Sequence, residues 1–230
     1  MEARVSDKLK DKVASEIASR VTSDIVIGVG TGSTVDLAIK KIGAKVTAQQ
    51  LNLKVICSSE ESSKACEANG LTVMYPGYAG TIDWGFDGAD AVDKNLWAIK
   101  GGGAALLREK ILAVRCKKYI LIVDDSKLVE NIAAKSVVPV EIIPEALSYV
   151  QRQLVQFNPR QIVLRQGTGK YGSVITEKGN FLIDVEFSAI TPDLANKLKC
   201  IVGVVETGLF IDCVDEILVA SPAGVTSLKK

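Results

Sequence analysis

Short runs of consecutive apolar residues alternate with segments of helical periodicity through the first half of the chain. Residues 25–29 and 119–123 are such runs, and residues 53–57 are apolar apart from Lys54; each segment predicts a buried strand. Apolar residues also recur at every fourth position from Val5 to Val21, which predicts an amphipathic helix. Strands that are apolar throughout are buried on both faces, so this alternation predicts an α/β fold with a parallel sheet covered by helices on both sides.

The other elements of this half are predicted from shorter signals. Gly43 predicts the end of one helix, and the sequence Ser58-Ser59-Glu60-Glu61 predicts a capping box at the start of the next. The complete expectation is helices at 5–21, 34–42, 58–70 and 104–116, and strands at 25–29, 53–57, 71–75, 82–87 and 119–123.

The order of predicted strands and helices changes after residue 134. Strands are expected at 137–143, 161–165, 181–187 and 201–205, with one helix at 144–157 and another that begins at Thr191-Pro192-Asp193. This β-α-β-β-α-β order is typical of a ferredoxin-like α+β domain. A last apolar strand at 216–220 is expected to return to the first sheet. The predicted domains are therefore a parallel-sheet domain of residues 1–134 and 207–230, and an inserted ferredoxin-like domain of residues 135–206.

Composition limits the chemistry that the chain can perform. The 230 residues include no histidine, which excludes Ser-His-Asp and Cys-His catalysis and histidine-ligated zinc. Acid–base work must therefore use Asp, Glu, Lys, Tyr or Cys. The net charge of +1 gives no general attraction to nucleic acid or an anionic membrane.

Cysteine usage and the absence of targeting segments predict a cytoplasmic protein. The five cysteines include no C-x-x-C pair, so reduced thiols are expected rather than disulfides or a zinc site. The N-terminal segment mixes acids and bases and has no apolar core, so no signal peptide is expected. No run of residues is apolar enough to predict a membrane span.

A glycine-rich loop, GVGTGST at 28–34, lies between a predicted strand and a predicted helix. Its glycines allow several backbone N–H groups to converge, and the hydroxyls of Thr31, Ser33 and Thr34 together with the helix dipole would complete an anion site. The loop has neither the lysine of a Walker A loop nor the spacing of a dinucleotide fingerprint. The alternative is a tight turn that binds nothing.

Three further segments carry charged residues beside predicted strand or helix ends. Asp87 and Asp90 could converge on a small molecule, bind a metal or form a solvated turn. Lys100 precedes three glycines and a predicted helix, which favours a second anion site over a flexible loop. Residues 124–127 end a predicted strand, where α/β folds bind ligands; the alternative there is an N-cap at Ser126 and a surface lysine.

Two remaining motifs are ambiguous. Glu109 has apolar neighbours three and four residues away on its predicted helix, so desolvation could give it the raised pKa of a general base, or it could pair with an internal cation. The sequence GTGK at 167–170 resembles part of a phosphate loop. However, Tyr171 and not a helix follows it, so a hairpin turn is expected.

Taken together, these motifs resemble the type A ribose-5-phosphate isomerases over essentially the whole chain. The matching segments, in order, are GVGTGST at 28–34, DGAD at 87–90, IKGGGAALLREK at 99–110, DDSK at 124–127, PVEIIP at 139–144, RQG at 165–167 and GLF at 208–210. The resemblance implies a Rossmann-like domain with an inserted ferredoxin-like domain. It also implies interconversion of D-ribose 5-phosphate and D-ribulose 5-phosphate without a metal or cofactor, by a homodimer or a dimer of dimers.

The resemblance further implies a role for each matched residue. Glu109 would move a proton between C1 and C2 of the sugar. Asp87 and Asp90, with Gly88 and Ala89 between them, would handle the sugar hydroxyls and ring opening. The cradle for the enediolate oxygen would be Lys100, Gly101, Gly102 and Gly103. The phosphate ligands would be Thr31, Gly32, Ser33, Thr34 and Lys127, with Lys10 as an addition. Ala91 stands where the family often has Glu, which affects only a supporting role.

Two other functions are compatible with part of this pattern. A sugar-phosphate-sensing module without turnover would keep the phosphate loop and lose the base, but Glu109 is present. A glucosamine-6-phosphate deaminase would depend on a histidine, which this chain lacks.

Overall fold

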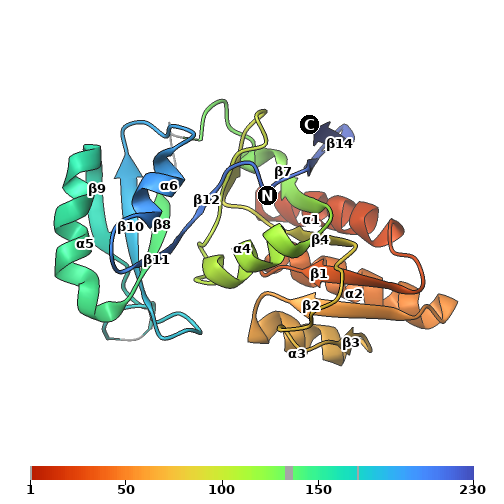
Figure 1. The fold of residues 1–230 in the computed structure, drawn as a ribbon. Helices are drawn as coiled ribbons and strands as arrows, with labels where there is room; N and C mark the ends of the chain where they lie inside the picture. The colour runs from red at the N-terminus through yellow and green to blue at the C-terminus, as the bar shows by residue number, and fades with distance from the viewer. Residues whose placement is uncertain (1, 133–136, 170) are drawn as a thin grey trace. The chain divides into compact units, whose positions relative to one another are not determined.

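The computed structural model describes residues 2–132, 137–169 and 171–230. The chain forms two compact units (Figure 1). The first consists of Met1–Ala89, Arg108–Leu128 and Asp212–Lys230, and the second of Asp90–Leu107 and Val129–Ile211. Within the described residues, no helix has the length and apolar character needed to cross a membrane.

A seven-stranded sheet forms the centre of the first unit. Its order is β14-β13-β7-β4-β1-β2-β3, and every neighbouring pair is parallel except β13 and β14. The order reverses direction between β1 and β4, as in Rossmann-like sheets, which confirms the predicted fold. The strands are β1 (Ile25–Val29), β2 (Leu53–Cys57), β3 (Thr72–Val73), β4 (Trp84–Asp87), β7 (Tyr119–Asp124), β13 (Glu216–Ser221) and β14 (Gly224–Lys229).

Helices cover both faces of this sheet because the strands are apolar on both sides. On one face, Ile27 and Val29 belong to the same core as residues of α1 and α2. On the other face, Leu112 of α4 packs with Ile56 and Ile82, and Gly28 leaves room for the Leu112 side chain. The helices are α1 (Glu2–Ser19), α2 (Ser33–Gln49), α3 (Glu60–Ala68) and α4 (Leu106–Arg115).

The predicted end of α2 at Gly43 is wrong. The helix continues to Gln49, and Gln50 ends it in a left-handed conformation with φ 52°. Tertiary packing leaves no room for a side chain at Gly43, because a Cβ there would lie 2.4 Å from the Asn69 carbonyl oxygen. The predicted capping box is displaced by one residue, because Ser59 caps α3 by accepting a hydrogen bond from the Ser62 N–H at 3.0 Å.

The second unit contains the predicted ferredoxin-like arrangement. Its four strands lie in the order β11-β8-β10-β9 with every pair antiparallel, and two helices connect them. These elements are β8 (Val138–Ile142), α5 (Leu147–Leu154), β9 (Pro159–Leu164), β10 (Phe181–Phe187), α6 (Leu194–Lys199) and β11 (Val204–Thr207), with short 3-10 turns η2 (Pro144–Ala146) and η3 (Val155–Phe157) around α5. The helix α6 begins later than expected, with Asp193 rather than Thr191 at its N-cap.

A separate three-stranded sheet also belongs to the second unit. It consists of β5 (Ala91–Val92), β6 (Ala98–Ile99) and β12 (Leu209–Phe210). Ile99 pairs with both outer strands, and it shares a core with Val140 of the four-stranded sheet. Segments 90–107 and 207–211 therefore lie in the second unit, although they were expected in the first domain. Residues 129–132 differ from the expectation in the same way, since the Val129 N–H donates to the Val92 carbonyl of β5.

The GTGK segment forms part of a hairpin connection between β9 and β10. The Gly167 N–H donates to the Gly172 carbonyl at 2.9 Å, and Gln166 forms an antiparallel bridge with Ser173. The described residues of this segment therefore form the predicted hairpin turn. Lys170 lies outside the described residues.

A buried carboxylate on β13 makes the first unit sensitive to acid. Burial works to raise the pKa of Glu216, but hydrogen bonds from Arg20, Lys118 and Ser227 outweigh it and lower the pKa from 4.5 to about 2. The unfolded chain binds this proton more readily, so the stabilisation by Glu216 is present above pH 4.5 and is lost as the pH falls toward 2.

We expect Glu216→Gln to lower the unfolding free energy at pH 7 by about 1.5–3 kcal/mol, the range for hydrogen bonds to charged groups. Urea unfolding between pH 7 and pH 3 measures this. The variant should also lose less stability than the parent as the pH falls. Glu186→Gln, in the exposed ion pair with Arg160, should change little. Parallel stability curves for Glu216→Gln and the parent would contradict the assignment.

Candidate active site

Three adjacent parallel strands end beside one another in the first unit. They are β7, β4 and β1, and their order in the sheet reverses between β4 and β1. Carboxyl ends of parallel strands at such a reversal are where α/β folds bind ligands. Residues 30–34 of the predicted phosphate loop follow β1, Asp87 ends β4 and is followed by Gly88 and Ala89, and the segment 124–127 begins at the last residue of β7.

The phosphate loop ends in an open helix N-terminus. Gly32 is the N-cap of α2, has a φ of 130° and supplies no capping side chain. Lys10 of α1 reaches the same place, because its Nζ donates to the Ser33 hydroxyl at 3.1 Å. Backbone N–H groups, the positive end of a 17-residue helix and an ammonium group together favour an anion there.

Thr31 differs from the other predicted phosphate ligands. Its Oγ1 lies 2.8–3.2 Å from the hydroxyl oxygens of Ser58, Ser59 and Ser62, and Ser62 in turn donates to the Gly30 carbonyl at 2.6 Å. This serine cluster follows β2 and anchors the loop to the neighbouring strand. The Thr31 hydroxyl therefore fixes the shape of the loop, and the exposed hydroxyl on the first turn is that of Ser33.

Asp87 is fully buried at the end of β4. Its Oδ1 accepts hydrogen bonds from the N–H groups of Thr31 at 3.0 Å and Gly88 at 2.7 Å, and its Oδ2 accepts one from the Tyr119 hydroxyl at 2.9 Å. Gly30 makes this position possible, because a Cβ there would lie 2.0 Å from Asp87 Cγ. The carboxylate is thus held in one orientation against the phosphate loop.

Tyr119 is a site residue that the sequence did not reveal. It begins the apolar run at 119–123 and its side chain is fully buried. Burial raises the pKa of its phenol well above the ordinary value, and the nearby charges of Asp87 and Glu109 raise it further. The phenol therefore stays protonated at neutral pH and remains a hydrogen-bond donor to Asp87.

Glu109 is buried on α4, with 4% of its surface exposed. Its charge acts on Tyr119, as that of Asp87 does, so both predicted catalytic carboxylates of the first unit lie within electrostatic range of one phenol. Glu109 and Asp87, which are 22 positions apart in the sequence, thus share Tyr119 as an electrostatic neighbour.

Lys127 follows β7 in a short 3-10 turn, η1 (Asp125–Lys127). Asp124, rather than Ser126, caps this turn by accepting a hydrogen bond from the Ser126 N–H at 3.0 Å. The Asp124 side chain therefore stabilises the 3-10 turn, and the partly exposed Lys127 is the cationic residue of the segment 124–127.

In the second unit, a short hairpin places Asp90 opposite Lys100. Asp90 precedes β5 and Lys100 follows β6, and the Asp90 N–H donates to the Ile99 carbonyl at 2.9 Å. Asp90 is exposed, whereas Lys100 is 2% exposed. The Lys100 Nζ lies 5.5 Å from the centre of the Phe210 ring, a cation–π arrangement.

The three glycines after Lys100 form a turn rather than the first turn of a helix. Gly101 has a φ of 108°, and the Ala104 N–H donates to the Gly101 carbonyl at 3.1 Å. The helix α4 begins only at Leu106, two residues later than predicted. The Gly102 N–H donates to Asp90 Oδ2 at 2.8 Å, and a Cβ on Gly102 would lie 2.7 Å from Asp90 Oδ1.

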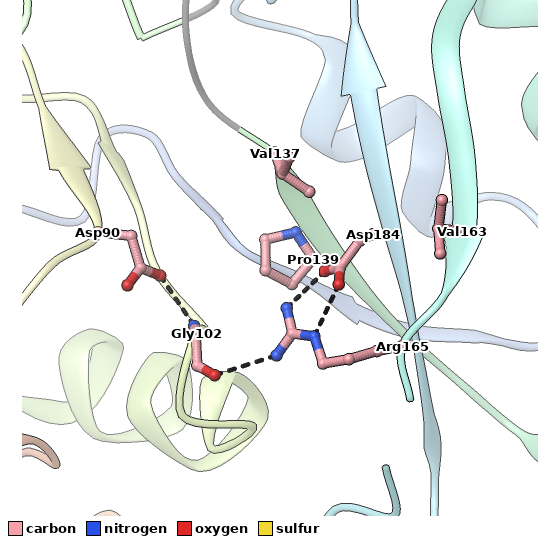
Figure 2. Close-up of a pocket in the computed structure, with 7 residues that line it drawn as sticks. All are labelled: Asp90, Gly102, Val137, Pro139, Val163, Arg165 and Asp184. Atoms are coloured by element: carbon pink, nitrogen blue, oxygen red, sulfur yellow. Dashed lines mark hydrogen bonds and ion pairs between the residues drawn. The ribbon is translucent and has the colours of Figure 1, made fainter. Parts of the chain in front are cut away.

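This glycine turn borders a cavity of about 480 Å³ within the second unit (Figure 2). Figure 2 shows Arg165, which the sequence analysis did not assign to the site, between Asp184 and the glycine turn. The lining residues are Asp90, Gly102, Val137, Pro139, Val163, Arg165 and Asp184. Across the described part of the chain, no three acidic or cysteine side chains are grouped so that they could hold a metal ion.

Comparison with known proteins gives consistent results. Residues 54–224 match the family model for ribose 5-phosphate isomerase A (phosphoriboisomerase A). The chain is 40% identical over 210 residues to ribose-5-phosphate isomerase A of Pyrococcus abyssi, which covers 90% of this chain and 91% of the relative.

Solved structures of the same kind superpose closely on the chain. Ribose 5-phosphate isomerase A of Methanocaldococcus jannaschii is 37% identical with a TM-score of 0.93, over 98% of this chain and all of the other. A D-ribose-5-phosphate isomerase in complex with phospho-erythronic acid is also 37% identical, with a TM-score of 0.95 over 98% of this chain and 99% of the other.

We expect Tyr119→Phe to lower the unfolding free energy by about 1.5–3 kcal/mol, because it removes a buried hydrogen bond to a carboxylate and keeps the ring. Denaturant unfolding measures this difference. Tyr75→Phe, on an exposed tyrosine of the same unit, is the matched control and should stay within about 0.5 kcal/mol of the parent. Equal stability losses in the two variants would show that the Tyr119 hydroxyl does not hold Asp87.

Proposed function

The chain belongs to the ribose 5-phosphate isomerase A family, and on that premise we propose that it interconverts D-ribose 5-phosphate and D-ribulose 5-phosphate. One observation carries the assignment to its own residues. At the reversal of strand order, the buried Asp87 accepts a hydrogen bond from the backbone of a phosphate-type loop, and it shares the Tyr119 phenol as an electrostatic neighbour with a second buried carboxylate, Glu109.

The phosphate group would be the anchor of the substrate. The open N-terminus of α2, with Gly32, Ser33 and Thr34, offers backbone and hydroxyl donors, and Lys10 already contacts Ser33. Lys127 would be a further cation that contacts the phosphate, the role that the family resemblance implies for it. An anchored phosphate supplies binding energy that orients the sugar carbons for reaction.

The proton transfer would be the task of Glu109. After the sugar ring opens, the Glu109 carboxylate removes the proton from C2. The electrons of that bond form the C1–C2 double bond, and the electrons of the C1 carbonyl move onto O1 to give an enediolate. O1 then gains a proton and the C2 hydroxyl loses one, with Asp87 and Asp90 as the groups that exchange protons with these oxygens. As the C2 carbonyl forms, the electrons of the double bond take the proton back from Glu109 at C1. A single carboxylate can perform both transfers on one face of the planar intermediate.

Each of the other charged residues has a separate role in this proposal. Asp87 and Asp90 exchange protons with the sugar hydroxyls and assist ring opening. Lys100 and the glycine turn, through the N–H groups of Gly101 and Gly103, stabilise the negative charge that develops on the enediolate oxygen, while the Gly102 N–H donates to Asp90. Fixed donors at a developing charge are worth a few kcal/mol of transition-state stabilisation.

A sugar-phosphate sensor without turnover is less well supported. Such a module needs the phosphate loop but has no use for a buried carboxylate at the position of Glu109. The family match over residues 54–224 includes the loop after β4, the glycine turn and the helix that carries Glu109. We further propose a cytoplasmic enzyme that works as a homodimer or a dimer of dimers; the five free thiols are compatible with that compartment.

The direct test is to incubate the purified chain with D-ribose 5-phosphate in the presence of EDTA and to measure D-ribulose 5-phosphate. We expect turnover in the parent. Glu109→Gln keeps the shape of the side chain and removes its basicity, so we expect a loss of at least about 1000-fold in kcat. Exchange of the C2 proton with solvent deuterium, followed by NMR, should stop in the same variant.

The control for Glu109→Gln is binding of phospho-erythronic acid measured by calorimetry, which should be retained. Near-parental exchange of the C2 proton in this variant would mean that the base lies elsewhere, with Asp87 the next candidate. Binding of the sugar phosphate by a parent that produces no ketose would support the sensor instead.

We expect Lys127→Ala to raise KM for D-ribose 5-phosphate by about tenfold and to lower kcat by less, because a phosphate contact acts in the ground state and the transition state alike. Steady-state kinetics measure both constants. Lys54→Ala is the control, since Lys54 is exposed near the amino end of β2, whereas the candidate site lies at the carboxyl ends of the parallel strands. A lower kcat with unchanged KM in Lys127→Ala would contradict a phosphate role.

A further inference from the structure

We propose that Arg165 is a positioning residue that fixes the glycine turn and, through it, the carboxylate of Asp90; this inference rests on the proposed isomerase function. The Arg165 side chain is largely buried, with 16% exposed. Its Nη1 donates to the carbonyl oxygens of Gly101 at 2.7 Å and Gly102 at 3.2 Å. Figure 2 shows the guanidinium group between the turn and Asp184.

Asp184 holds the guanidinium group in one plane. Arg165 Nε donates to Asp184 Oδ2 at 2.8 Å, and Nη2 donates to Oδ1 of the same carboxylate. Such a two-point contact fixes orientation as well as distance, which a lysine could not reproduce. The Arg165 backbone is also fixed, because its N–H donates to the Leu182 carbonyl and its carbonyl accepts from the Val174 N–H.

One peptide unit connects Arg165 with Asp90. The carbonyl of Gly101 accepts from Arg165, and the N–H of Gly102, in the same planar peptide, donates to Asp90 Oδ2 at 2.8 Å. The hydrogen bonds therefore run from Asp184 through Arg165 and this peptide to Asp90. A peptide between two glycines rotates easily because neither residue has a side chain, and bonds at both its ends select one orientation.

Packing does not replace this restraint on the side of the turn that borders the cavity. Asp90, Gly102, Arg165 and Asp184 all line the same hollow of about 480 Å³. The turn is also supported at its start, where the Lys100 N–H donates to the Gly208 carbonyl at 2.9 Å, and within itself, where the Ala104 N–H donates to the Gly101 carbonyl at 3.1 Å. Neither bond links the 101–102 peptide to Asp184 of β10, so loss of the guanidinium group would remove that link while Lys100 stays in place.

An ordinary ion pair between strands is the competing explanation, and the chain contains a matched example. Arg160 of β9 pairs with Glu186 of β10 at 3.2 Å. The Arg165–Asp184 pair similarly joins the residue after β9 to a residue of β10. Arg160 donates to Glu186 on the exposed surface, away from the glycine turn. A purely structural role predicts that loss of either arginine affects stability alone.

The test compares Arg165→Met with Arg160→Met in the full chain, assayed with D-ribose 5-phosphate. We expect Arg165→Met to lower kcat by about 10- to 100-fold, because small displacements of a catalytic group cost that much, with KM changed by less than about threefold. Arg160→Met should retain the parental kcat. In Arg165→Ala, millimolar guanidinium chloride should restore part of kcat by entering the enlarged cavity, and it should not stimulate Arg160→Ala.

Parental kcat in Arg165→Met, or equal losses in the two methionine variants, would overturn the proposal, as would the absence of rescue by guanidinium. If Arg165→Met does not fold by circular dichroism, Asp184→Asn and Arg165→Lys decide the matter: both should fold and lower kcat more than KM changes, and parental kcat in both refutes the role. An inactive parent refutes the proposed function and this inference together, whereas an active parent with unaffected Arg165 variants refutes only the inference.

Discussion

The buried carboxylate of Asp87 is the interaction on which the rest of the first unit's site depends. A buried charge is stable only if hydrogen bonds replace its hydration, and the N–H groups of Thr31 and Gly88 and the Tyr119 phenol supply them. The same carboxylate leaves no space for a side chain at position 30. The glycine-rich loop therefore has two constraints, one from the phosphate that we propose it binds and one from the Asp87 carboxylate beside it.

Much of the fold could be predicted because its signals are local. The strands β1 and β2 lie at the predicted residues, since an apolar run between turn residues specifies a buried strand without reference to the rest of the chain. The helix end predicted at Gly43 was wrong because a glycine is needed there for the close approach of Asn69 and not to end the helix. The strand β14 was missed because its half-exposed, polar sequence pairs only at the edge of the sheet.

Some residues of the candidate site also have local sequence signals, and others do not. Glycines and charged residues at strand and helix ends identified Asp87, Asp90 and Lys100 as candidates, whereas Glu109 was identified by its apolar neighbours on the helix and by the family resemblance. Tyr119 escaped notice because it stands in a run of apolar residues and acquires its role from a carboxylate 32 positions away. Arg165 is 64 positions from the Gly101 carbonyl that it contacts. Neither pairing leaves a pattern in a single sequence, because only the fold brings the partners together.

The two aspartates of the DGAD segment are three positions apart and yet have opposite environments. Asp87 is fully buried and is bonded to a strand-end loop and a phenol, whereas Asp90 is exposed and is bonded to one peptide of a glycine turn. Paired carboxylates in different surroundings commonly have different tasks. A buried, immobile carboxylate suits a fixed contact to a sugar hydroxyl. An exposed carboxylate has to be held by its neighbours before it can act, which explains why the turn beside Asp90 has glycine at each position where a side chain would collide, and an arginine to keep its peptide in place.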